Sequence, residues 1–263
     1  MSSRLRAIAA ETVAVVERGW YRVGATEVVI RDQVERARKE TRLHLPEASA
    51  PVRGTGVTPR IEVTNESSLD AARRLGGDVA CLVFASARNP GGGFLNGAQA
   101  QEEAIARCSA LHACLLEAPE FYAHHRADAD LRYTDRVIHS PAVPVFRDDR
   151  GDFLTAASTV SFLTAAAPNL GAIKRDQPQH LASVPAVLAR RAARVVGLAA
   201  HHGHRTLVLG AWGCGVFEND PAVVAATFRR AIDDHPYFER IVFAVLDKRA
   251  GEPTYEAFAR AFT

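Results

Sequence analysis

The chain has 263 residues, enough for one large α/β domain or two small ones, and 48% apolar with 24% charged residues is ordinary globular composition. The net charge of +2 is too small for a protein that coats nucleic acid, so local loops and helix ends would have to attract an anionic ligand. The sequence contains no run of 18 apolar residues, so no membrane span is predicted. The four cysteines lack C-x-x-C spacing, which argues against a zinc site or a disulfide framework and favours a reducing cytoplasm.

The N-terminal segment predicts a helix rather than a secretion signal. Residues 4–21 carry Glu11 inside their apolar part and show no cleavage pattern, which a signal peptide would need. Apolar side chains recur there at helical spacing, so we expect an amphipathic helix. The residues expected on its buried side are Leu5, Ile8, Thr12 and Val16.

Residues 1–55 as a whole predict an extension that packs on the main domain. The first helix is followed by a short strand at 26–30 and by a charged helical run at 31–45, whose charges form a solvated face. A connector rich in proline and glycine spans 46–59 and marks the expected boundary. The second unit, 56–263, is then the main domain.

From residue 60 onward, predicted strands alternate with predicted helices. Strands are expected at 60–67, 78–87, 135–146, 158–168, 206–212 and 240–247. Helices are expected at 68–75, 101–117, 184–203 and 220–234, with a short closing helix after the last strand. Ser68 is the expected N-cap of the first of these helices. The alternation predicts an α/β fold of three layers, in which helices cover both faces of a largely parallel sheet.

Two glycine-rich segments follow predicted strands, at the edge of the sheet where ligands bind in such folds. They read "RNPGGGF" at 88–94 and "GAWGCGVFEND" at 210–220. Neither is a P-loop, because no Gly-Lys-Ser/Thr follows, and neither has the G-x-G-x-x-G spacing of a dinucleotide turn. Backbone N–H groups and helix N-termini would hold a phosphate there, and two such loops suit a pyrophosphate. The alternative is that these glycines only make turns that need positive φ.

Two adjacent glutamates open the helix expected at 101–117. Glu102 lies near the apolar side of this helix, and Glu103 is rotated from it by about 100° around the axis. Neighbours on a helix do not face each other, so the pair cannot share a proton and should address different atoms of one ligand. The alternative is that both carboxylates only favour the helix dipole. The apolar side comprises Ile105, Cys108, Leu111, His112 and Leu115.

Other candidate groups carry weaker signals. Three histidines crowd a helix end, where a solvated imidazole is favourable, and two more lie in an expected polar loop without metal-ligand spacing, so no metal site is predicted. No G-x-S-x-G motif supports serine-hydrolase chemistry, and three of the cysteines are expected to be small buried hydrophobes. These residues are His201, His202 and His204, then His124 and His125, and finally Cys81, Cys108 and Cys114.

The pattern "GGGFLNGAQAQEE", a glycine triplet followed after a spacer by Gln-Glu-Glu, resembles the signature of poly(ADP-ribose) glycohydrolases. The segment "GAWGCGVFEND" is similar to the second phosphate loop of the macrodomain on which that family is built. Residues 9–21 and 64–75 resemble its shorter bacterial-type branch, so the resemblance covers nearly the whole chain. It implies a macrodomain with a mixed central sheet, and a mainly helical N-terminal extension that closes the site around the terminal unit of the polymer.

The resemblance also implies a role for each matching residue. Glu103 is the implied catalytic acid/base, Glu102 holds hydroxyls near the scissile bond, and Gln101 supports the loop. Asn89 contacts the distal ribose, the glycine triplet bends around the diphosphate and ribose, and Phe217 packs on the nucleoside. The implied ADP-ribose-binding residues are Asn89, Gly91, Gly92, Gly93, Gln101, Gly213, Cys214, Gly215, Val216 and Phe217.

The implied reaction is hydrolysis of the ribose–ribose O-glycosidic bond, mainly from the polymer terminus, with ADP-ribose as product. The implied substrate is poly(ADP-ribose) or an ADP-ribosylated protein. We expect a cytoplasmic monomer of the DNA damage response that needs no cofactor or metal and contacts neither DNA nor a membrane. Two alternatives stay open: a macrodomain that binds ADP-ribose without cutting it, against which the intact Gln-Glu-Glu argues, and a hydrolase of mono-ADP-ribosyl or O-acetyl-ADP-ribose bonds.

Overall fold

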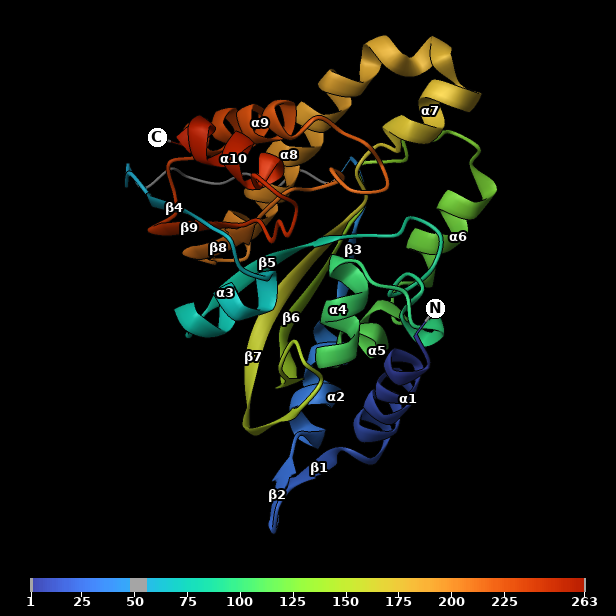
Figure 1. The fold of residues 1–263 in the computed structure, drawn as a ribbon, viewed down its shortest axis with the longest axis vertical. Helices are drawn as coiled ribbons and strands as arrows, with labels where there is room; N and C mark the ends of the chain where they lie inside the picture. Colours follow the sequence, from blue (N-terminus) through green and yellow to red (C-terminus); the bar gives the residue numbers. More distant parts are fainter. Residues whose placement is uncertain (1, 48–55, 263) are drawn as a thin grey trace.

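A seven-stranded mixed sheet forms the centre of the protein in the computed structural model, which describes residues 2–47 and 56–262 (Figure 1). Its strands are β3 (Arg42–His44), β4 (Arg60–Thr64), β5 (Val79–Phe84), β6 (Val137–Arg147), β7 (Phe153–Ala165), β8 (Thr206–Leu209) and β9 (Arg240–Ala244). Their order is β3-β6-β7-β5-β8-β9-β4, antiparallel at β3–β6 and β6–β7 and parallel at the other four pairs. The mixed sheet is confirmed, and the largely parallel arrangement holds only from β7 to β4.

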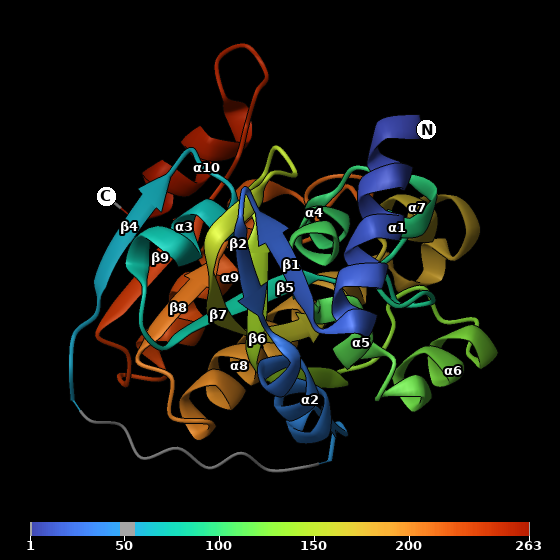
Figure 2. The ribbon, with the colours of Figure 1, turned by 90° about the horizontal axis from the view of Figure 1, so that it is seen from below.

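Helices cover both faces of this sheet, which confirms the three-layer α/β/α architecture (Figures 1 and 2). On one face lie α1 (Ser3–Arg18), α2 (Arg31–Glu40), α3 (Ser68–Leu75), α4 (Gln101–Cys108), α5 (Leu111–Leu115) and α6 (Pro119–Ala127). On the other lie α7 (Leu170–Asp176), α8 (Val184–His201), α9 (Pro221–Asp233) and α10 (Pro253–Phe262). No helix of the described residues is long and apolar enough to cross a membrane. Along β5, Cys81 and Val83 pack into one core cluster and Ala80 and Leu82 into the other, because successive side chains of a strand point to opposite faces.

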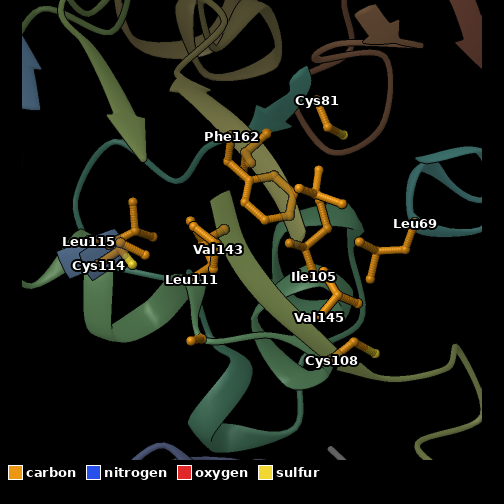
Figure 3. Close-up of a cluster of buried hydrophobic side chains, with 14 of the residues drawn as sticks. Leu69, Cys81, Ile105, Cys108, Leu111, Cys114, Leu115, Val143, Val145 and Phe162 are labelled. Atoms are coloured by element: carbon orange, nitrogen blue, oxygen red, sulfur yellow. The ribbon is translucent and has the colours of Figure 1, made fainter. Parts of the chain in front are cut away.

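The core beneath α4 and α5 is built from the predicted apolar positions. Ile105, Leu111 and Leu115 pack against Val145 of β6 and Phe162 of β7, and none of these five side chains is more than 1% exposed (Figure 3). The predicted small buried hydrophobes are confirmed, with exposures of 3% or less at Cys81, Cys108 and Cys114. Each of these thiols is free. This packing fixes the helix that carries the two glutamates against the sheet.

The first part of the chain contributes to the central sheet as well as to the helical layer. After α1 come a two-stranded hairpin of β1 (Trp20–Val23) and β2 (Thr26–Val29), then α2, and then β3. In β3, Arg42 pairs with His139 of β6, so this segment supplies an edge strand. Residues 48–55 of the predicted connector, and with them the boundary at 55/56, lie outside the described residues. The division into 1–55 and 56–263 therefore stays a prediction.

Two helices end earlier than the sequence predicts, because the residues that follow them pair with β6. The charged run is helical only to Glu40, and the expected helix at 41–45 is replaced by β3. The helix predicted over 101–117 breaks at Ser109, which is extended at φ −143° and forms a β-bridge with Val145. The predicted cap is also one residue late, since the Oγ of Ser67 accepts the N–H of Asp70. Backbone pairing with a neighbouring strand thus overrides a local helical pattern.

Three further details differ from the predictions. The buried side of α1 consists of Ala9, Thr12 and Val15, whereas Leu5, Ile8 and Val16 are only half-buried. The expected polar loop with His124 and His125 is α6, and His125 is 1% exposed. Strand β1 and helix α7 have no counterpart among the predicted elements. Their short apolar patterns are completed by contacts with distant parts of the chain.

Four histidines meet near the N-terminal ends of β5 and β8. The Nε2 of His139 is 3.1 Å from that of His204, and the Nε2 of His44 is 3.0 Å from that of His202. The rings of His139 and His202 stack with centroids 3.7 Å apart. The prediction of a solvated imidazole is wrong for His204, which is only 5% exposed. Its Nδ1 lies 2.8 Å from Oδ1 of Asp78. No group of His, Cys, Asp and Glu in the described residues is arranged to hold a metal ion.

Acidification is expected to destabilise the protein through this cluster. Burial lowers the pKa of His139 to about 2 and that of His202 to about 4. An unfolded histidine takes a proton below about pH 6.5 while these stay neutral, so stability is full above that pH and falls as the pH drops. His139 alone should cost about 1.4 kcal/mol per pH unit on that slope. Denaturant unfolding between roughly pH 6.5 and 4.5 should therefore give a flatter slope for His139→Leu. The exposed control His201→Gln should keep the wild-type slope, and equal slopes in both variants would contradict the prediction.

Candidate active site

Both glycine-rich loops lie at the carboxyl ends of neighbouring strands. β5 runs into residues 85–100, which lead to α4, and β8 runs into residues 210–220, which lead to α9. β5 and β8 are adjacent and parallel, with Cys81 beside Val208. The two loops therefore leave the same edge of the sheet, as the sequence predicts, and this edge is where α/β folds bind ligands.

The glycine triplet is in direct contact with both glutamates. Gly92 has φ +60°, and a Cβ added there would lie 2.3 Å from Oε1 of Glu103 and 3.1 Å from Oε2 of Glu102. Its N–H donates to the carbonyl oxygen of Asn89 at 3.0 Å, and the N–H of Gly93 donates to Oε1 of Glu103 at 3.0 Å. These two amides are thus already used within the protein. The missing side chain at Gly92 serves first to admit the carboxylate of Glu103.

Glu103 is held by backbone N–H groups from both sides. Oε1 accepts the N–H of Gly93, and Oε2 accepts the N–H of Ala100 at 3.0 Å. Ala100 is the N-cap of α4 and Glu103 is its third residue, so the second contact is one half of a capping box. The side chain is half-buried. It is oriented by local structure and keeps access to the loop edge.

Glu102 sits in a different environment, as the helical spacing predicts. It is 2% exposed, and its Oε2 accepts the N–H of Ser86 at 2.6 Å. Burial raises the pKa of Glu102 well above its usual range, with a smaller contribution from the charge of Glu103, and the hydrogen bond from Ser86 opposes the shift. Its Oε1 is buried and has no hydrogen-bonding partner among the described residues. A protonated Glu102 could therefore hydrogen-bond a ligand hydroxyl through that oxygen.

Gln101 connects the start of α4 to the end of β5. Its Oε1 accepts the N–H of Phe84 at 2.9 Å, and its Nε2 donates to the carbonyl oxygen of Leu82 at 2.7 Å. The same Nε2 donates to Oγ of Ser68 at 3.1 Å, which explains why Ser68 is buried rather than capping its helix. Gln101 thereby fixes the helix that carries both glutamates relative to the sheet.

The second loop is shaped by two buried residues that the sequence did not single out. Gly213 has φ +72°, and a Cβ there would lie 2.6 Å from Nδ2 of Asn219. That Nδ2 donates to the carbonyl oxygens of Gly213 at 3.1 Å and Pro168 at 2.9 Å. Trp212 donates through Nε1 to the carbonyl oxygen of Ala165 at 3.0 Å. Trp212 and Asn219 both belong to the segment "GAWGCGVFEND". Their polar side chains close to the glycines are the sequence feature that could have indicated a role in shaping this loop.

The tip of the second loop presents uncommitted backbone donors. Within the part of the chain that the structure describes, the N–H groups of Gly215, Val216 and Phe217 donate to no protein acceptor. Gly215 is exposed and Val216 is 86% exposed, whereas Phe217 is half-buried. Burial raises the pKa of the Cys214 thiol to about 12, so it is not a thiolate nucleophile at neutral pH. Consecutive free amides of this kind can bind an anion.

The segment before β6 contributes an aromatic residue that nothing in the sequence indicated. Tyr133 has φ 57°, a strained backbone for a residue with a side chain, and its ring centroid lies 6.1 Å from that of Phe217. The fully buried Arg191 holds this segment by donating to the carbonyl oxygen of Arg132 and to Oδ1 of Asp135, each at 3.0 Å. Burial lowers the pKa of Arg191 to about 10, which leaves the guanidinium charged at neutral pH. Tyr133 is thus held beside the second loop.

Comparisons with a family model and with solved structures identify the same protein family. The model of the microbial-type PARG catalytic domain matches residues 9–148. The poly(ADP-ribose) glycohydrolase (PARG) crystal structure from Thermomonospora curvata is 48% identical with a TM-score of 0.91, covering 99% of this chain and 100% of that one. A structure from the same organism bound to the inhibitor ADP-HPD is 50% identical with a TM-score of 0.91, covering 98% and 99%. PARG from Deinococcus radiodurans in complex with ADP-ribose is 44% identical with a TM-score of 0.84, covering 92% and 98%.

No curated protein sequence matches the chain. The family model nevertheless spans more than half of it and includes the glycine triplet and both glutamates. The solved structures extend the similarity to nearly every residue, in sequence as well as in backbone. The chain therefore belongs to the microbial-type poly(ADP-ribose) glycohydrolase family.

Proposed function

We propose that this protein hydrolyses the ribose–ribose O-glycosidic bonds of poly(ADP-ribose), mainly from the polymer terminus, and releases ADP-ribose. The observation that carries the proposal is the contact between the glycine triplet and the two glutamates, with no room for a side chain at Gly92 beside Glu103. The relatives add support, since one binds ADP-ribose and another binds the inhibitor ADP-HPD. A pure ADP-ribose reader would not need a carboxylate oriented in this way.

Glu103 is the proposed acid and base. As the bond between the anomeric carbon and the bridging oxygen breaks, Glu103 gives its proton to that oxygen, which leaves as a hydroxyl. Positive charge develops on the anomeric carbon at this stage. The carboxylate of Glu103 then takes a proton from a water whose oxygen bonds to the anomeric carbon. Each turnover thus consumes one water and returns the proton to Glu103.

The developing cation requires a negative charge that Glu102 does not supply, since its raised pKa favours the neutral acid. The substrate's own diphosphate fills this role if the loops fold it back towards the anomeric carbon. The free N–H groups of Gly215, Val216 and Phe217 are suited to hold it there.

The remaining residues bind the ADP-ribose unit in this proposal. The unpartnered Oε1 of Glu102 accepts or donates a hydrogen bond to a ribose hydroxyl near the scissile bond. Asn89, exposed directly before the triplet, contacts the distal ribose. Phe217, with the ring of Tyr133 6.1 Å away, packs on the nucleoside.

Incubation with labelled polymer and with a mono-ADP-ribosylated protein separates the alternatives. We expect free ADP-ribose to appear from the earliest times while long chains shorten gradually, because the site takes the terminal unit. Resolving the products by chain length measures this directly. Early fragments of intermediate length would instead indicate internal cutting. Release from the mono-modified protein alone would favour the hydrolase of another ADP-ribosyl bond, and binding without any product would favour a reader.

We further infer a cytoplasmic monomer that binds neither DNA nor membranes and acts on ADP-ribosylation after DNA damage. All four cysteines are free thiols, which suits a reducing compartment. The net charge of +2 provides no strong field to attract DNA. In this proposal residues 1–55 act as an extension of the catalytic domain, 56–263.

A further inference from the structure

The spacer between the glycine triplet and α4, residues 94–100, packs against α1 (Figures 1 and 2). Gly97 has φ +78°, and a Cβ there would lie 2.7 Å from the carbonyl oxygen of Ser2. The backbones of the spacer and of the start of the chain are therefore in direct contact. A small separate core cluster joins the two elements through Ala9, Phe94 and Ala106. The position of the spacer thus depends on α1.

A buried arginine of α4 also holds the spacer. Arg107 is 8% exposed, and its Nη1 donates to the carbonyl oxygen of Ala98 at 2.5 Å. It lies four residues after Glu103, one turn further along the helix. In the described ranges, 2–47 and 56–262, no carboxylate forms a salt bridge with Arg107. Its guanidinium therefore forms a hydrogen bond to a backbone carbonyl, and its charge also interacts with that of Glu103.

This contact leads by two hydrogen bonds to the proposed catalytic carboxylate. The N–H of Ala98 donates to the carbonyl oxygen of Gly93 at 3.2 Å. The N–H of Gly93 in turn donates to Oε1 of Glu103 at 3.0 Å. A shift of Ala98 is consequently passed through the Gly93 backbone to Glu103.

Thr12 extends the chain of contacts to α1 and β6. It is 2% exposed, and its Oγ1 donates to the carbonyl oxygen of Arg107 at 2.7 Å. Oγ1 of Thr12 also accepts a hydrogen bond from Nε of Arg147 at 3.1 Å. Arg147 in turn forms a salt bridge with Glu11 at 2.7 Å. A buried side chain with both its donor and its acceptor satisfied defines one geometry. Thr12 therefore locks α1 to the helix that carries Glu103.

We propose that Thr12 and Arg107 are positioning residues, through which α1 holds the spacer and orients Glu103 for the proton transfer. The N-terminal segment then contributes to the rate of the chemical step and not only to enclosing the polymer end. This inference rests on the proposed function. A displacement of about 1 Å at reacting groups costs roughly 100-fold in rate, so a loosened spacer should act mainly on kcat.

Paired variants test the proposal with the full chain. Thr12→Val keeps the shape but removes the hydroxyl, whereas Thr12→Ser keeps the hydroxyl. We expect kcat to fall about tenfold in Thr12→Val and about 100-fold in Arg107→Met, with KM and the Kd of ADP-ribose within about threefold of wild type. Thr12→Ser and Arg107→Lys should regain part of the loss. Arg229→Met is a surface control, because the half-exposed Arg229 also donates to a backbone carbonyl, that of Ala261, far from the spacer.

A merely structural role would give a different pattern. Equal losses in kcat and in ADP-ribose binding, or a full kcat in Thr12→Val and Arg107→Met, would overturn the proposal. An inactive wild-type protein would refute the proposed function instead. Amide hydrogen exchange of residues 93–100 would then test whether Thr12 positions the spacer. Faster exchange there in Thr12→Val than in Thr12→Ser is expected, and identical exchange in the two would sink the idea.

Discussion

Replacing Glu103 by glutamine is expected to reduce kcat on poly(ADP-ribose) by roughly 10³-fold, within the range of general acid–base catalysis. The amide has nearly the same shape as the carboxyl group but can neither give up a proton to the leaving oxygen nor take one from water. Its oxygen can still accept the N–H of Gly93, so the loop keeps much of its geometry. The Kd of ADP-ribose, measured by calorimetry, should therefore change little. Equal losses of binding and hydrolysis would mean that Glu103 only shapes the site.

Glu102→Gln is the matched comparison, because it removes the neighbouring acid from the same helical turn. The raised pKa of Glu102 indicates a neutral group that acts by hydrogen bonding, and an amide can replace much of that function. We expect a loss at least tenfold smaller than in Glu103→Gln, with the larger share in KM. A more severe kcat defect in Glu102→Gln would reverse the two roles, since raised pKa values are a mark of general acids.

The order of layers and the place of the site could be predicted because they depend on local patterns. Periodic apolar residues indicated most of the strands and helices, and glycines after strands indicated the ligand edge. The errors occur where a segment pairs with β6. Residues 42–44 continue a helical pattern but gain a sheet edge, and Ser109 interrupts an apolar stripe to form its bridge with Val145. Such pairing depends on residues far away in the chain and leaves no local signal.

The sequence predicted which residues form the site, but not which of their backbone N–H groups are free to bind a ligand. Spacing alone separated Glu102 from Glu103, and the structure gives them distinct burial and partners. The triplet suggested a phosphate cradle, yet the amides of Gly92 and Gly93 bond within the protein. The free amides lie in the second loop instead. The direction of an N–H group depends on backbone torsions that a glycine leaves open, so the sequence could not assign the donors.

Gly92→Ala should reduce kcat strongly, although less than the loss of the acid itself. The added Cβ would lie 2.3 Å from Oε1 of Glu103 and 3.0 Å from its Cδ, so the carboxyl group has to move. Moving it breaks the hydrogen bonds from Gly93 and Ala100, which orient it. We expect kcat to fall by about 100-fold, as for other displacements of reacting groups. Steady-state kinetics on labelled polymer measures the loss.

Gly24→Ala separates this clash from simple backbone strain. Gly24 has φ +58°, close to the +60° of Gly92, but a Cβ there meets nothing within 4 Å. Both substitutions carry the left-handed penalty of about 1–2 kcal/mol, so both should lower the thermal midpoint, and Gly92→Ala should lower it further because it also displaces Glu103. Only Gly92→Ala should lose kcat, and adding it to Glu103→Gln should cost little beyond the loss in Glu103→Gln alone, because both changes act on one carboxylate. An active Gly92→Ala, or additive losses in the double variant, would show that the glycine serves the ligand and not Glu103.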